Sequence, residues 1–292
     1  MIYFSYLRPD TLEEAIDILQ EHGNQAKVLA GGTDLLICLR QRTLRPRYVV
    51  SLKHVPGLKY IRYNRSQGLR LGALTTIGDI ETSEVVRQHY PMLAEAASGL
   101  GSVQIRNLAT VGGNLCNAAP SADMAPGLIG LRARAVVEGP EERYSVALED
   151  FFQGPGRTIL GPADILVEIR VPPPSPHTGA VYLSLSPRRA MDIPVVDIAA
   201  VVRLAAANGV CQDVRLVMGA VAPTPRRARR AEEVLRGQTI TDELINRAAA
   251  RARREARPIT DVRASADYRR EMVAVLSCRA LRQALELAQA QR

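Results

Sequence analysis

The strongest constraint on the fold is a proline-rich segment past the middle of the chain. Residues 172–176 read Pro-Pro-Pro-Ser-Pro, and proline removes a backbone donor and favours extended chain. Such a segment fits neither a helix nor the middle of a sheet, so it predicts a linker between two domains, 1–175 and 176–292. The 292 residues, of which 47% are hydrophobic, allow each domain a buried core of its own.

Before the linker, the pattern of apolar residues alternates between strands and helices. Thr11, three residues before Glu14, predicts a capped helix over 11–22, and Gly23 predicts its end. With strands at the amino terminus, at 27–30 and at 48–52 and a helix opening at Leu35, residues 1–56 form a β-α-β-α-β subdomain that is too small to stand alone and must pack on the next subdomain. That second subdomain, 57–175, is expected to contain strands at 60–63, 69–73, 133–138 and 165–171 and helices at 84–88, 92–98 and 124–130.

After the linker, the pattern changes to β-rich runs followed by helices. The runs 195–205 and 210–220 are joined by Asn208-Gly209, which predicts an antiparallel hairpin. Apolar residues at helical spacing predict a long helix over 267–289. Residues 176–292 are therefore expected to form a separate α+β domain.

Composition excludes several classes of protein. No apolar run approaches the roughly 20 residues of a membrane span, and the first residues do not resemble a signal peptide, so we expect a cytoplasmic protein. The cysteines, Cys38, Cys116, Cys211 and Cys278, stand far apart, which argues against a zinc site, an iron–sulfur cluster or a disulfide framework in this chain. Redox chemistry would therefore come from a bound organic cofactor or from a partner.

The net charge of +8 is concentrated near the carboxyl terminus. From Ala222 onward, 16 Arg and no Lys stand against 9 acidic residues. These arginines alternate with Glu and Ala in helical segments such as 229–233 and 253–256, a pattern typical of solvated or partner-facing helices. Because only 4% of residues are aromatic, stacking side chains for nucleic acid are scarce. We expect no nucleic-acid partner, although a cofactor-free binding module with basic helices remains an alternative.

Two glycine turns carry the functional signal: Ala30-Gly31-Gly32-Thr33-Asp34 and Thr110-Val111-Gly112-Gly113-Asn114. Consecutive glycines let the backbone approach a ligand, and successive N–H groups form an anion-binding nest. Neither turn matches the G-x-G-x-x-G fingerprint or the P-loop. One such turn is usually only a tight turn, but two, each closed by small polar residues, predict a divided diphosphate site.

The segments 28–36 and 101–115 resemble the FAD-binding medium subunit of molybdenum hydroxylases, a family that includes carbon monoxide, xanthine, aldehyde and hydroxybenzoyl-CoA oxidising enzymes. The resemblance covers nearly the whole chain. It implies an α+β fold, with a two-part FAD-binding domain of the split-site, vanillyl-alcohol-oxidase-like type before a smaller α+β domain with an antiparallel sheet and helices. It also implies a flavoprotein subunit of an oxidoreductase, with no acid–base catalyst of its own.

The same resemblance implies partners for the chain. They are a small subunit with two [2Fe-2S] clusters and a large subunit with a molybdenum cofactor, assembled as a dimer of heterotrimers. FAD would take electrons from the clusters and pass them to an external acceptor. A stand-alone FAD-dependent reductase or oxidase of the same fold class is the alternative enzyme.

The resemblance also assigns FAD contacts by position. Backbone groups of the two turns would hold the diphosphate from two sides, and Asp123 would accept from hydroxyls of the flavin's sugar or ribityl part. Without the family, Asp123 is predicted to cap the helix before Met124, and Leu100 and Leu166 are predicted core residues. The expected FAD-binding residues are Val28, Leu29, Ala30, Gly31, Gly32, Thr33, Asp34, Leu35, Leu100, Ala109, Thr110, Gly112, Gly113, Asn114, Asp123 and Leu166.

Some features of the family pattern leave questions open. Arg106 and Asn107 belong to the second motif and either touch FAD or brace the turn. Ser184 stands where some members carry a lysine four residues before an Arg-Arg pair, here Arg188-Arg189. This substitution leaves NAD, a quinone, oxygen and other carriers as alternative electron acceptors. The chain has no cysteine-rich loop like that of the hydroxybenzoyl-CoA branch.

Overall fold

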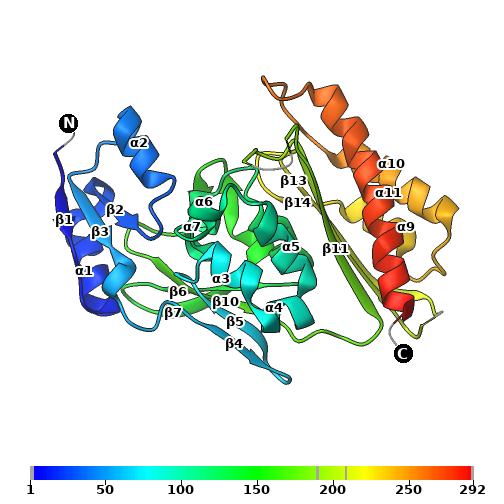
Figure 1. The fold of residues 1–292 in the computed structure, drawn as a ribbon, viewed down its shortest axis with the longest axis horizontal. Coiled ribbons are helices and arrows are strands. Elements are labelled where there is room, and N and C mark those ends of the chain that lie inside the picture. The colour runs from blue at the N-terminus through cyan, green and yellow to red at the C-terminus, as the bar shows by residue number, and fades with distance from the viewer. Residues whose placement is uncertain (1–2, 189–190, 208, 291–292) are drawn as a thin grey trace.

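The computed structural model describes residues 3–188, 191–207 and 209–290. Three bodies follow one another along the longest axis in chain order (Figure 1). A small parallel sheet lies at the amino-terminal end, a larger sheet with short helices lies in the middle, and a third sheet covered by long helices lies at the carboxyl-terminal end. The fold is therefore the expected α+β type, with a two-part first half and a smaller second half.

The amino-terminal body is the predicted β-α-β-α-β unit. All its strands are parallel, with β3 in the centre. The Thr11 hydroxyl accepts from the Glu14 N–H at 3.1 Å, as the capping pattern predicted, and Gly23, with φ of 49°, ends the first helix. Its elements are β1 (Ser5–Leu7), α1 (Leu12–His22), η1 (Gly23–Gln25), β2 (Ala26–Leu29), α2 (Leu35–Gln41), β3 (Tyr48–Ser51) and η2 (Leu52–His54).

The middle body is an antiparallel sheet with helices on one face. The strand order is β4-β5-β10-β6-β7, so β10, the last strand before the proline linker, returns to the centre of the sheet. The strands are β4 (Ile61–Asn64), β5 (Gly68–Gly72), β6 (Arg134–Glu138), β7 (Arg143–Ala147) and β10 (Ile165–Val171), with a side hairpin of β8 (Phe152–Gly154) and β9 (Arg157–Thr158) after η3 (Leu148–Asp150). The helices are α3 (Ile77–Thr82), α4 (Glu84–His89), α5 (Pro91–Gly99), α6 (Val103–Arg106), α7 (Val111–Asn117) and α8 (Met124–Gly130).

The amino-terminal body packs on this sheet, as its small size predicted. Ala15 and Leu19 of α1 share one hydrophobic cluster with Val136, Ile165 and Val167 of the middle sheet. Side chains of the other face of the sheet and of α3, α5, α7 and α8 form the largest cluster of the molecule. The two glycine turns thus lie on elements that are fixed by burial on both sides of one sheet.

The carboxyl-terminal body is an antiparallel sheet of order β11-β12-β13-β14. Its strands are β11 (Thr178–Leu185), β12 (Val196–Leu204), β13 (Cys211–Gly219) and β14 (Arg226–Arg227), and its helices are α9 (Arg229–Leu235), α10 (Asp242–Glu255) and α11 (Ala266–Ala290). The helices cover one face, whereas Ala199, Val201 and Val217 of the other face join the core of the middle body. The predicted hairpin is confirmed as the β12–β13 pair, and its residue Asn208 lies outside the described residues.

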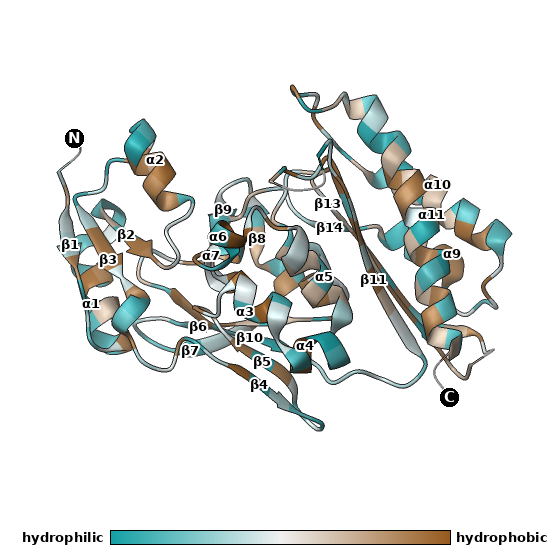
Figure 2. Cartoon of the chain, in the orientation of Figure 1, coloured by the Kyte–Doolittle hydropathy of each residue, from teal (hydrophilic) through white to brown (hydrophobic). Residues whose placement is uncertain are grey.

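The basic helices behave mostly as their charge pattern predicted. Arg229, Arg230, Arg251 and Arg253 are exposed, and hydrophilic residues alternate with hydrophobic ones along α10 (Figure 2). Arg269 is the exception, because only 2% of it is exposed and its guanidinium donates to two backbone carbonyls and to a carboxylate. No helix within the described ranges is both long and apolar enough to span a bilayer.

The sequence missed several short elements. The second glycine turn is in fact the first turn of α7, with Thr110 as its N-cap. The helices α3 and α6 and the strand β7 were not predicted either, because each has only four to six residues. Such short elements carry too little periodic pattern to separate helix or strand from loop.

Candidate functional site

The structure brings the two glycine turns into contact. A Cβ atom added to Gly31 would lie 2.2 Å from the carbonyl oxygen of Leu108 and 3.0 Å from the Cα of Ala109. A Cβ on Gly113 would lie 3.9 Å from the Cβ of Ala30. In Figure 1 the end of β2 accordingly faces α6 and α7. The turns that lie far apart in the sequence therefore line one place in the fold.

The first turn leaves a run of backbone donors unused. Gly32 has φ of 85°, a left-handed conformation that favours glycine, and its carbonyl accepts from the Leu36 N–H at 3.0 Å as α2 begins. Within the described ranges, none of the successive N–H groups from Gly31 to Leu35 donates a hydrogen bond to the chain. Successive N–H groups around a left-handed residue form a concave anion site, so this turn has the expected nest.

The second turn is different, because its backbone donors are already used. Val111 donates to the Thr75 carbonyl at 3.0 Å and Gly112 to the Ala73 carbonyl at 2.9 Å. Gly113 donates to the Thr110 hydroxyl at 3.0 Å, and Asn114 donates to the Thr110 carbonyl at 2.9 Å. The prediction that N–H groups of both turns form nests is therefore wrong for the second turn. Its backbone is bound to its own helix and to the loop after β5.

The glycines of the second turn are explained by packing within the chain. A Cβ on Gly112 would lie 2.7 Å from the carbonyl oxygen of Ala73 and 2.8 Å from its Cβ. A Cβ on Gly113 would lie 2.9 Å from the Thr110 hydroxyl that caps α7. Real Cβ atoms do not approach other atoms so closely, and Ala73 is held by buried backbone. Gly112 is thus required for close approach between two parts of the protein itself.

The side chain of Asn114 is the polar group that the second turn leaves unpaired. Its Oδ1 atom is buried and has no hydrogen-bond partner within the described part of the chain. Buried polar atoms are nearly always paired, so an orphaned one next to an open nest points to a polar ligand. Contact between Asn114 and a bound group stays a prediction, and the unpaired oxygen supports it.

The other residues of the first turn contribute mainly backbone. The Asp34 side chain is exposed, and the Thr33 hydroxyl approaches it only to 3.5 Å. Leu35 packs against a small cluster that contains Leu29, whereas Val28 is 37% exposed. The Asp34 carboxylate would repel the negative charge of a diphosphate. A diphosphate held at this turn would therefore be bound by the backbone N–H groups and not by this side chain.

Three apolar residues of the expected site lie in the protein core. Leu100 is 8% exposed, Leu166 is 4% exposed and Ala109 is 7% exposed, and all three belong to the largest hydrophobic cluster. For Leu100 and Leu166 this is the core position that the pattern alone predicted, and Ala109 joins them. FAD contact at these positions stays a prediction from the resemblance.

Arg106 braces the second turn. Its guanidinium donates to both carboxylate oxygens of Glu81 on α3, at 2.6 and 3.2 Å, and to the carbonyl of Leu100 at 3.2 Å. The side chain is almost fully buried, at 11% exposure. These bonds use three of its five N–H donors on the protein itself, so of the two roles left open for Arg106 the structure shows the bracing one.

Asp123 does not cap the helix that it precedes. No backbone N–H of α8 donates to its carboxylate, although the residue immediately precedes Met124. The half-buried carboxyl instead lies near Asp197 of β12, and desolvation raises the pKa of Asp123 above its ordinary value. The interpretation of Asp123 as a helix cap is therefore wrong, and the carboxyl remains available to a ligand.

Asp197 is the residue of this region that the sequence did not predict. It is 0% exposed, and neither carboxylate oxygen makes a hydrogen bond of ordinary geometry within the described ranges. Burial raises the pKa of Asp197, and the negative charge of Asp123 raises it further, while the hydroxyls of Ser184 and Tyr182 oppose the rise. The only signal in the sequence was one acidic residue inside the apolar run 195–205.

The two acids, buried Asp197 and half-buried Asp123, lie where the two halves of the chain meet. Asp197 pairs in register with Ser184 of β11 and with Gly219 of β13. The loop that leads to Asp123 is tied to the same sheet, because the Ala220 N–H donates to the Pro120 carbonyl at 2.8 Å. Arg188 is paired with Asp192 at 3.4 Å, and Arg189 of the predicted Arg-Arg pair lies outside the described residues.

Comparison with known proteins identifies the family. Residues 2–174 match the family described as the FAD binding domain in molybdopterin dehydrogenase, and residues 181–284 match the CO dehydrogenase flavoprotein C-terminal domain. The chain belongs to this family of FAD-binding subunits of molybdenum-containing dehydrogenases, and it is thus a flavoprotein subunit of an oxidoreductase.

Similar proteins cover nearly the full length of the chain. The xanthine dehydrogenase FAD-binding subunit of Escherichia coli O157:H7 is 33% identical over 98% of this chain and 97% of its own. Among solved structures, carbon monoxide dehydrogenase from Hydrogenophaga pseudoflava, a form that lacks the Mo-pyranopterin moiety of the molybdenum cofactor, aligns with a TM-score of 0.93 at 34% identity over 98% of each chain. Quinoline 2-oxidoreductase from Pseudomonas putida 86 aligns with a TM-score of 0.90 at 28% identity over 98% of each chain.

Proposed function

We propose that this chain is the FAD-binding electron-transfer subunit of a molybdenum hydroxylase complex. The observation that carries the proposal is the contact between an open nest of N–H groups, Gly31 to Leu35, and a turn with a buried, unpaired amide oxygen at Asn114. A diphosphate fits the nest, since it accepts several hydrogen bonds and carries negative charge. The family assignment makes FAD the diphosphate-containing ligand.

Each part of the site has a separate task in this proposal. The nest of the first turn holds the diphosphate, and the Thr110 hydroxyl and the Asn114 Nδ2 group donate to it from the second turn. The unpaired Asn114 Oδ1 atom accepts from a hydroxyl or N–H group of FAD. Asp123 accepts from hydroxyl groups of the sugar or ribityl part, because its carboxylate does not cap α8. When bound, FAD supplies two-electron redox chemistry, and the protein positions it and excludes water.

The partners are inferred from relatives of the same length. Similar proteins are named as medium chains or FAD-binding subunits of carbon monoxide and xanthine dehydrogenases. We therefore propose a small partner with [2Fe-2S] clusters that delivers electrons, a large partner with the molybdenum cofactor, and assembly as a dimer of heterotrimers. Relatives of nearly equal similarity have names with different substrates, so the substrate has to be found by assay of the assembled complex.

The proposed domain boundary is the proline linker. Residues 1–175 form the FAD-binding domain, with subdomains at about 1–56 and 57–175, and residues 176–292 form the carboxyl-terminal domain. The sheets support this division, because β10 ends at Val171 and the next strand, β11, begins the separate sheet at Thr178.

FAD titration of the purified chain tests the proposal. Gly32→Ala forces a side chain into a left-handed backbone at the nest, and Gly237→Ala is a matched control, since Gly237 has φ of 76° in open space on the carboxyl-terminal body. The unmodified protein and the control should bind FAD alike, whereas Gly32→Ala should weaken binding at least about tenfold, or about 1.4 kcal/mol. Equal affinity in both variants, or no FAD binding by the unmodified chain, contradicts the proposal.

A further inference from the structure

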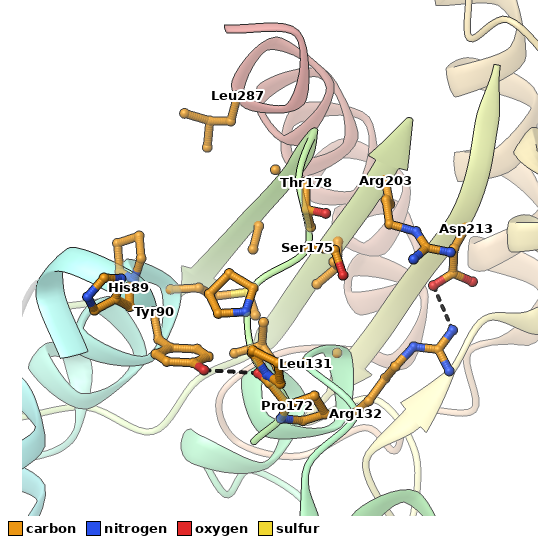
Figure 3. Close-up of a pocket in the computed structure, with 18 of the residues that line it drawn as sticks. His89, Tyr90, Leu131, Arg132, Pro172, Ser175, Thr178, Arg203, Asp213 and Leu287 are labelled. Atoms are coloured by element: carbon orange, nitrogen blue, oxygen red, sulfur yellow. Dashed lines mark hydrogen bonds and ion pairs between the residues drawn. The ribbon is translucent and has the colours of Figure 1, made fainter. Parts of the chain in front are cut away.

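A cavity of about 620 Å³ lies between the two halves of the chain (Figure 3). Its walls are the α4–α5 corner, the end of α8, the proline linker, the strands β11 to β13 and the last turn of α11. Thr178, at the start of β11, lines it, whereas Ser184 lies beside Asp197 near the other end of that strand. Six strand residues span about 20 Å, so this cavity is separate from the proposed FAD site. Its size is in the range of small-molecule sites.

Most of the cavity wall is apolar. Met92, Pro173, Val201 and Leu287 line it, together with other linker prolines. The Tyr90 hydroxyl is already used, because it donates to the Pro172 carbonyl at 2.9 Å (Figure 3). A ligand of this cavity therefore needs a largely hydrocarbon body.

The charged groups of the cavity are not balanced. Arg132 donates to the Asp213 carboxylate at 2.7 Å, and Arg236 approaches the same carboxylate at 3.8 Å. Arg203 of β12 also lines the cavity, but its side chain has no hydrogen bond or ion pair within the described ranges, and its Nε atom is enclosed without a partner. In Figure 3 the Arg203 guanidinium lies between Asp213 and Ser175, with no bond to either. The cavity thus contains two guanidinium groups and one carboxylate.

An unpaired, partly enclosed guanidinium favours an anion, and its planar fork matches a carboxylate. Asp213 lies opposite Arg203 in the β12–β13 register, so a ligand with two negative charges would be repelled. The apolar walls disfavour a small hydrated anion. We propose that this cavity binds an apolar monocarboxylate, with its carboxylate on Arg203 and its hydrocarbon part between the proline linker and α11.

Such a ligand would join parts of both halves. Met92 and the linker belong to the first half, and Arg203 and Leu287 belong to the second. Because a ligand stabilises the state that binds it, the carboxylate should also raise the unfolding temperature of the whole chain.

Isothermal titration of the FAD-loaded full chain tests the proposal with octanoate, and with 1-octanol as a neutral control of equal length. Octanoate should bind at one site per chain, at least about tenfold more tightly than 1-octanol. A parallel titration with benzoate distinguishes an aliphatic from an aromatic acid, and binding of either supports the site. Binding of neither acid, or equal affinity for octanoate and 1-octanol, overturns it.

Variants place the acid in the cavity. Arg203→Met keeps an unbranched side chain but removes the guanidinium, and it should remove the preference for octanoate over 1-octanol. Leu287→Glu adds a carboxylate to the cavity wall at a position that is 48% exposed, whereas Gln283→Glu adds the same charge to an exposed position of α11 outside the wall. Leu287→Glu should abolish octanoate binding, whereas Gln283→Glu should leave it unchanged. This comparison still tests the proposal if Arg203→Met does not fold. Unchanged octanoate binding in Leu287→Glu overturns the proposal.

Discussion

The two glycine turns have similar sequences but different roles. The first leaves the N–H groups from Gly31 to Leu35 without acceptors in the described part of the chain, whereas the second donates every N–H from Val111 to Asn114 to the chain itself. Gly32 is required by its left-handed backbone, but Gly112 is required because Ala73 leaves no space for a side chain. A Gly-Gly pair therefore signals close backbone approach, and only the surrounding structure shows whether a ligand or the protein approaches.

The largest expected effect is that of Gly112→Val. Its side chain would overlap the backbone of Ala73, and overpacking of a buried site costs typically about 1–3 kcal/mol and sometimes more. We expect a large fall in the unfolding temperature of the FAD-free chain, measured by circular dichroism. A variant that unfolds like the unmodified chain and loses only FAD would show that the second turn is a binding turn like the first.

The buried acids give the next effect, which depends on pH. The folded-state pKa of Asp197 lies above its unfolded value, so its favourable contribution is present below the ordinary carboxyl pKa of about 4 and is lost as pH rises through the folded value. Asp197→Asn removes this loss. Relative to the unmodified chain, the variant should gain more than about 1.4 kcal/mol of stability between pH 5 and pH 8, because one pKa unit corresponds to about that energy.

Urea unfolding of both proteins at the two pH values measures this gain. The titratable and polar groups that face Asp197 are Asp123, Tyr182 and Ser184. Asp123 interacts with Asp197, so removal of the Asp197 charge also lowers the pKa of Asp123, and the difference reports the titration of the pair. An identical stability difference at pH 5 and pH 8 would rule out a buried, pH-dependent acid at this position.

The smallest effect is expected for Asn114→Leu. This substitution should lower FAD affinity without lowering the stability of the FAD-free protein. The Oδ1 atom has no partner in the described part of the chain, so replacing it should leave the FAD-free protein as stable as before or slightly more stable. FAD affinity should fall about tenfold, the value of one hydrogen bond of about 1.4 kcal/mol. Thermal unfolding without FAD and titration with FAD give the two values, and a loss of stability without a loss of affinity would make Asn114 a structural residue.

Local signals in the sequence predicted much of the fold. The Thr11 cap, the alternation of strands and helices before Ser51 and the apolar stripe of α11 depend on residues close together in the chain, and the structure confirms them. The proline linker and the β12–β13 hairpin were predicted for the same reason.

The differences arise from contacts between distant residues. No local pattern shows that the carbonyls of Ala73 and Thr75 accept the N–H groups of the second turn. Nor does a pattern show that Asp123 lies near Asp197, because sheet register and the packing of α8 bring them together. Resemblance to a family indicated where the site lies. Only the tertiary structure shows which turn has N–H groups that are free to bind a ligand and which turn has N–H groups bonded to the protein itself.

Amide hydrogen exchange with and without FAD tests the different roles of the two turns most directly. Amides without acceptors exchange quickly, and hydrogen-bonded amides in buried structure exchange slowly. Peptides that cover residues 31–35 should exchange quickly in the FAD-free chain and become protected when FAD is added, whereas peptides that cover 111–114 should be protected in both states. Fast exchange at 111–114 with protection by FAD, or no protection at 31–35, would contradict the assignment of the nest to the first turn.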